Sequence, residues 1–146
     1  MINMVTGKDS INAYIGDKGL KIAGMTHLSG KEALEIAVNG GLFIDLRESI
    51  ESDYKKFDVP EVVYLPAEEL AARLSEIPRD RPVIMADSVG LRSKEAVKFL
   101  VLQGWNNVAN LNGGILDWEH DGMPIKVDDS KKLSGSCTCR LRPPGK

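Results

Sequence analysis

The first 136 residues of this 146-residue chain contain no cysteine, so that part of the chain has no thiol nucleophile and no cysteine metal ligand. The sequence also lacks any run of about 18 apolar residues, and it therefore predicts no membrane-spanning segment. Its beginning shows no apolar signal core, which makes the cytoplasm the expected location. The net charge of −2 gives no general attraction to nucleic acid, so we expect neither nucleic acid nor membrane as a partner.

The composition is typical of one globular domain. Hydrophobic residues make up 42% of the chain and charged residues 27%, and a chain of this length can bury a core without disulfides. The charge is uneven, because the residues from 131 onward include five basic and no acidic side chains, whereas residues 1–130 carry a net charge of −7. We expect an irregular lead-in over 1–24, one domain over 25–127 and a basic tail over 128–146.

Short apolar runs alternate with helical patterns along the chain. The runs have the length of buried strands and cover residues 42–44, 62–65, 83–86 and 108–111. Helices are predicted over residues 31–38, 67–77, 93–103 and 115–120. This alternation predicts an α/β fold with a parallel sheet covered on both faces, in which ligands bind at the carboxyl ends of the strands.

A short loop joins the third apolar run to the helix that follows it. Such a turn gathers backbone N–H groups in one hollow that favours an anion; Gly90 permits a positive φ and Arg92 adds a charge. The predicted anion-binding loop consists of Asp87, Ser88, Val89, Gly90, Leu91, Arg92 and Ser93. The alternative is an ordinary turn in which Asp87 or Ser88 caps the helix.

The loop resembles the Cys-x-x-Gly-x-Arg-Ser motif of the rhodanese family, with Asp87 in place of the cysteine. Further stretches over residues 26–125 resemble the family's motifs in the same order: Asp45-Leu46-Arg47-Glu48, Phe57-Asp58-Val59-Pro60, Gly104-Trp105 with Val108, and Gly113-Gly114-Ile115 with Trp118. Several spaced motifs are more specific than one motif alone. The resemblance implies a rhodanese-like three-layer α/β/α fold with a central, mostly parallel sheet.

The resemblance also implies what the loop does in the family and what differs here. Sulfurtransferases of this family hold sulfur on the loop cysteine as a persulfide, which the carboxylate of Asp87 cannot form. That carboxylate can accept the same N–H bonds, and Asp45 and Arg47 are expected to support the loop. Phe57 and Asp58 replace the family's Gly-His pair. The loop is also one residue shorter than in phosphatase relatives, which disfavours phosphatase activity.

Both cysteines of the chain, Cys137 and Cys139, lie in the basic tail, where Arg140 and Arg142 would favour thiolates. One interpretation is a terminus whose cysteines do nothing specific. A second is a displaced sulfur-carrying site that folds back onto Asp87. The third is a metal or redox site, but for a metal a Cys-x-Cys pair supplies only two ligands, and His27 and His120 lie far away in sequence. We therefore predict no metal and no cofactor.

The sequence thus predicts a rhodanese-like domain with a degenerate loop and without classical thiosulfate sulfurtransferase activity. Its expected role is that of a binding or regulatory module for a protein or a small sulfur-containing or anionic ligand. The alternative is a sulfurtransferase or thiol-redox protein that works through Cys137 or Cys139. His27 and His120 are interpreted as surface or strand-end residues rather than catalysts.

Overall fold

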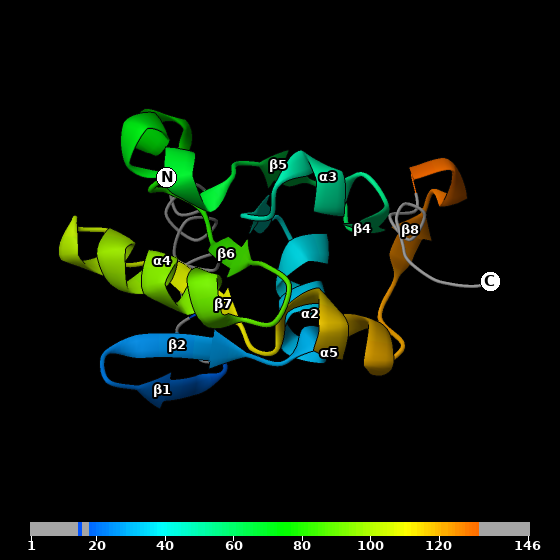
Figure 1. Cartoon of the computed structure of the whole chain (residues 1–146). Helices are drawn as coiled ribbons and strands as arrows, with labels where there is room; N and C mark the ends of the chain where they lie inside the picture. Colours follow the sequence, from blue (N-terminus) through cyan, green and yellow to red (C-terminus); the bar gives the residue numbers. More distant parts are fainter. Residues whose placement is uncertain (1–14, 16–17, 132–146) are drawn as a thin grey trace, which may run out of the picture.

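The computed structural model describes residue 15 and residues 18–131. A six-stranded sheet lies at the centre of this part of the chain (Figure 1). Its strands lie in the order β1-β2-β7-β6-β3-β5, and every neighbouring pair is parallel except β1 with β2. The strands are β1 (Leu20–Ile22), β2 (Met25–Leu28), β3 (Leu42–Asp45), β5 (Val62–Tyr64), β6 (Val83–Ala86) and β7 (Val108–Leu111). The predicted α/β fold with a mostly parallel sheet is confirmed.

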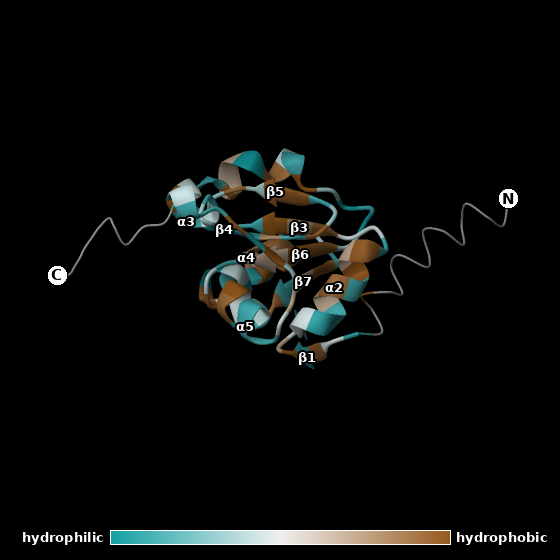
Figure 2. Cartoon of the chain, turned by 90° about the vertical axis from the view of Figure 1, so that its right-hand side faces the viewer, coloured by the Kyte–Doolittle hydropathy of each residue, from teal (hydrophilic) through white to brown (hydrophobic). Residues whose placement is uncertain are grey.

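Helices cover both faces of this sheet. Side chains of α2 (Gly30–Val38) and α5 (Gly114–His120) pack on one face, and side chains of α4 (Leu91–Leu102) pack on the other. Figure 2 shows the apolar strands enclosed between α2 and α4. Successive strand residues serve opposite faces, as the pleat requires, so Phe43 belongs to one core cluster and Ile44 to the other.

The predicted helix over 67–77 is wrong as a single α-helix. The chain forms two 3₁₀ segments instead, η1 (Ala67–Glu69) and η2 (Ala71–Glu76). Arg73 departs from helical geometry, with φ −120° and ψ 27°, and its guanidinium is held by Glu69 and Glu76. Leu70 and Ile77 still reach the core, so the apolar spacing is satisfied by a tighter and broken helix.

Several short elements have no counterpart in the sequence prediction. They are β2, α3 (Ser49–Ser52), β4 (Lys55–Phe57), β8 (Ile125–Val127) and η3 (Asp129–Lys131), and β4 pairs with β8 in an antiparallel ribbon. Within the segment expected to be irregular, Leu20–Ile22 form the edge strand β1, and the side chain of Ile15 is buried in the core. None of the helices in the described part of the chain is both long enough and apolar enough to cross a membrane.

Candidate functional site

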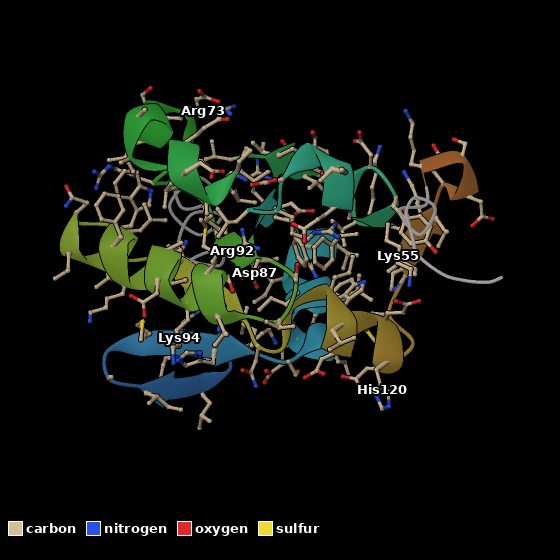
Figure 3. The ribbon with its side chains drawn as sticks, in the orientation of Figure 1. Lys55, Arg73, Asp87, Arg92, Lys94 and His120 are labelled. Atoms are coloured by element: carbon tan, nitrogen blue, oxygen red, sulfur yellow. The ribbon has the colours of Figure 1, made fainter. Side chains whose placement is uncertain are left out.

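The loop after β6 folds around the side chain of Asp87. One carboxylate oxygen, Oδ2, accepts hydrogen bonds from the backbone N–H of Arg92 at 2.8 Å and of Ser93 at 3.3 Å. The other, Oδ1, accepts from the backbone N–H of Gly90 at 2.5 Å, and Asp87 is only 1% exposed. Arg92 and Ser93 belong to the first turn of α4, so this carboxylate caps the helix as well as filling the hollow. Figure 3 shows Asp87 and Arg92 side by side at this end of α4.

The backbone of α5 holds the loop from behind. The N–H of Ile115 donates to the carbonyl of Asp87 at 2.9 Å, and the N–H of Leu116 donates to that of Ser88 at 3.1 Å. The approach needs glycine at the start of the helix, because a Cβ at Gly114 would lie 2.4 Å from the carbonyl carbon of Ser88. Gly114 therefore lets α5 fix the loop by main-chain bonds.

Asp45 and Arg47 form a buried ion pair at the end of β3. The guanidinium donates to both carboxylate oxygens, at 3.0 Å and 2.8 Å, and both residues are under 5% exposed. Arg47 also donates to the carbonyl oxygens of Glu51 at 3.4 Å and Lys55 at 2.7 Å. The pair thus fastens the segment that contains α3 to the carboxyl end of the sheet.

That segment places Glu51 at the mouth of the loop. The Ser88 hydroxyl donates to one carboxylate oxygen of Glu51 at 3.5 Å, and the Arg92 guanidinium lies 3.9 Å from the other. A ligand anion that approaches the hollow would meet this second carboxylate. Glu51 has no place in the motifs quoted from the sequence, because its position depends on how Arg47 folds the chain between β3 and β4.

Replacing Arg47 by methionine is expected to lower the free energy of unfolding by about 3 kcal/mol, since it leaves the Asp45 carboxylate buried without its charged partner. The estimate is at the lower end of the usual range because Asp45 keeps the bond from the backbone N–H of residue 47. Urea unfolding measures the change. The matched control is Arg73→Met, which removes an exposed guanidinium with two carboxylate partners and should have a far smaller effect. Equal effects of the two substitutions would contradict the role given to Arg47.

A buried polar chain leads from the loop to β2. The Ser93 hydroxyl lies 3.3 Å from Asp87 Oδ1 and donates to Asn110 Oδ1 at 2.5 Å, and the Asn110 amide nitrogen lies 3.1 Å from His27 Nδ1. Ser93 and Asn110 are at most 1% exposed. Burial, and after it the charge of Lys94, lower the pKa of His27 below its usual value. The interpretation of His27 as a strand-end residue fits its position but misses this connection.

The remaining candidate residues lie elsewhere. His120 is at the far end of α5 with its side chain exposed (Figure 3). Phe57 is buried and packs edge-on against Phe43 and Trp118, at centroid distances of 5.2 Å and 5.4 Å, so it supports the core. Cys137 and Cys139 lie outside the described residues. Within the described part of the chain, no three metal-ligating side chains come together.

Comparisons with known proteins identify the family of this fold and loop. A family model described as rhodanese-like domain matches residues 29–121, and the chain belongs to this family. A protein named sulfurtransferase from Allochromatium vinosum is 38% identical over 84 residues, which are 58% of this chain and 77% of that protein. The thiosulfate sulfurtransferase GlpE of Actinobacillus pleuropneumoniae is 30% identical over 103 residues, 70% of this chain and 94% of that protein.

Solved structures show the same fold. A rhodanese-related protein from Thermoplasma volcanium superposes with a TM-score of 0.62 at 24% identity, over 70% of this chain and 98% of that one. A rhodanese-like domain protein from Staphylococcus aureus gives a TM-score of 0.60 at 20% identity, over 70% of this chain and 99% of that one. The chain is therefore a rhodanese-like α/β domain, and the two relatives described above are named sulfurtransferases.

Proposed function

We propose that Asp87 occupies the position of the family's sulfur-carrying cysteine, and that the domain does not catalyse classical transfer of sulfur from thiosulfate. Its role is instead to bind and regulate, with a protein or a small sulfur-containing or anionic ligand as its partner. The observation that supports this proposal is the carboxylate of Asp87, which accepts the backbone N–H bonds of Gly90, Arg92 and Ser93.

Those donors are the groups that a persulfide or a bound anion would need. A carboxylate already satisfies them with a full negative charge, and it offers no atom that can carry sulfur. An incoming thiosulfate would have to displace this built-in anion and also approach the carboxylate of Glu51. Both effects oppose sulfur transfer at the loop.

The chemistry that remains at the loop is recognition. The Arg92 side chain is 49% exposed, and its contact with Glu51 is long at 3.9 Å. Its guanidinium is therefore available to a carboxylate, phosphate or sulfur oxyanion on a partner. Hydrogen bonds from α5 and to the Asp87 carboxylate hold several backbone groups of the loop in place, and such preorganisation suits a binding surface.

The second candidate function is sulfur transfer or thiol redox chemistry through Cys137 or Cys139. It is favoured by one feature of the sequence, namely that the only two thiols of the chain stand together beside Arg140 and Arg142. Because these thiols are outside the described residues, the two candidates are separated by experiment.

A cyanide and thiosulfate assay tests both candidates. We expect the unmodified chain to produce no thiocyanate above a buffer control, and mass spectrometry after incubation with thiosulfate to find no sulfur adduct on any peptide. The comparison is a chain with both Cys137→Ser and Cys139→Ser. If the unmodified chain produces thiocyanate and the double serine variant does not, the second candidate is supported. Turnover that persists in the double serine variant would contradict the proposed loss of activity at the loop.

A further inference from the structure

A cavity of about 360 Å³ lies between the β1–β2 hairpin, the loop after β6 and the first turns of α4. It is a different space from the hollow that Asp87 fills, although Gly90 contributes to both. Much of its wall is apolar and is provided by Leu20, Ile22, Ala23, Met25, Val89 and Leu91. Leu20, Ile22, Val89 and Leu91 are large apolar side chains that remain exposed, each at 47% or more. A ligand with an apolar part would cover them.

The polar part of the wall is positive or neutral. Lys94 and His27 line the cavity with the amides of Asn110 and Asn112, and none of the described lining residues is Asp or Glu. This is unusual on a body whose residues 1–130 carry a net charge of −7. Figure 3 shows Lys94 on the side of α4 that is turned toward the hairpin. The cavity therefore favours a negatively charged group.

His27 is held in place by buried neighbours. Its Nδ1 is 3.1 Å from the amide nitrogen of Asn110, whose oxygen accepts from the buried Ser93 hydroxyl. If the amide N–H donates to Nδ1, the ring nitrogen Nε2 carries the proton and can act as a donor. A fixed donor beside a lysine loses little conformational freedom when an anion binds.

We propose that this cavity binds a small organic anion that has an apolar body, with its charged group at Lys94 and His27 and its body against the hairpin and Val89. The inference adds a ligand class and a second place to the binding role proposed above, but it uses neither the chemistry of Asp87 nor the tail cysteines, so the two proposals can fail separately. The ligand class follows from the wall, which combines two basic side chains, no carboxylate and an exposed apolar surface.

Hexanoate is a suitable probe, and hexanol and hexylamine serve as comparison compounds of the same chain length. Binding is measured by the amide chemical shifts of the full-length ¹⁵N-labelled chain. We expect hexanoate to give saturable shifts at residues 20–27, 89–94 and 110–112. Butanoate should bind roughly tenfold more weakly, because two buried methylene groups are lost. Hexanol should bind at least fivefold more weakly and hexylamine should give no saturable shifts in these segments.

The matched variants are Lys94→Gln and Lys98→Gln. Both remove one exposed lysine charge from α4, but only Lys94 lines the cavity. Lys94→Gln should weaken hexanoate about fivefold and Lys98→Gln less than twofold. Hexanoate should also raise the pKa of His27, because a bound anion opposes the effect of the Lys94 charge, whereas hexanol should leave this pKa unchanged. The chemical shifts of the His27 ring protons measure the change. Equal binding of hexanoate and hexanol, equal effects of the two variants, or shifts confined to other segments would overturn the proposal.

Discussion

The Asp87→Cys variant is expected to take up sulfur from thiosulfate and to release thiocyanate with cyanide about a hundredfold faster than the buffer control, from which the unmodified chain should not differ. The physical reason is the set of N–H donors from Gly90, Arg92 and Ser93, which would stabilise a thiolate and then a persulfide where they now hold a carboxylate. The thiolate attacks the outer sulfur of thiosulfate and sulfite leaves with the electron pair of the broken S–S bond. Cyanide then removes the outer sulfur of the persulfide and restores the thiolate.

The experiment uses a background with Cys137→Ser and Cys139→Ser, so that each variant has one thiol. Ser88→Cys is the control, because it introduces a thiol in the same loop but at a side chain that contacts Glu51 rather than the three N–H groups. Adding Glu51→Gln to Asp87→Cys should increase the rate about fivefold by removing a carboxylate from the mouth. If the variants at residues 87 and 88 react equally slowly, the hollow does not stabilise a sulfur anion and the position assigned to Asp87 is wrong.

The central strands are predictable from the sequence because their burial is complete on both faces. The apolar run at 83–86 coincides with β6, the stretch at 108–111, which is apolar apart from Asn110, coincides with β7, and the run at 42–44 lacks only the last residue of β3. The 67–77 segment shows the limit of this reasoning. Its spacing fits an α-helix, but Arg73 departs from helical geometry where its guanidinium bonds two glutamates, and a pattern of apolar residues does not record that.

The loop after β6 is also predictable from the sequence, because the residues that define it are close together in the chain. An acidic residue, a glycine and a helix start within seven residues suffice to expect N–H groups around an anion, and the structure puts the Asp87 side chain among them. The alternative interpretation, a turn in which Asp87 caps the helix, fits these hydrogen bonds as well, because Arg92 and Ser93 belong to the first turn of α4. Glu51 and Asn110 could not be found in this way, because their contacts with Ser88 and Ser93 join residues 37 and 17 positions apart.

Removing the built-in anion should be costly for stability. Asp87→Ala is expected to lower the free energy of unfolding by about 4 kcal/mol, because it leaves the N–H groups of Gly90, Arg92 and Ser93 without their charged acceptor in a buried site. The hollow would then be an empty anion site. Sulfate at 100 times its dissociation constant should restore about 2.7 kcal/mol by binding only the folded chain.

Urea unfolding at a fixed ionic strength, with sodium chloride replaced stepwise by sodium sulfate, separates the two parts of this prediction. Sulfate stabilises most proteins through exclusion from their surface, so the informative quantity is the gain of Asp87→Ala over that of the unmodified chain. Asp80→Ala is the control, since it removes an exposed carboxylate from the turn before β6 and should change stability by less than about 0.5 kcal/mol. An Asp87→Ala chain that loses less than about 1 kcal/mol, or gains no more from sulfate than the control, would mean that the N–H groups find other acceptors. The Asp87 carboxylate would then contribute little to the stability of the loop, and its displacement would not oppose the binding of a sulfur anion.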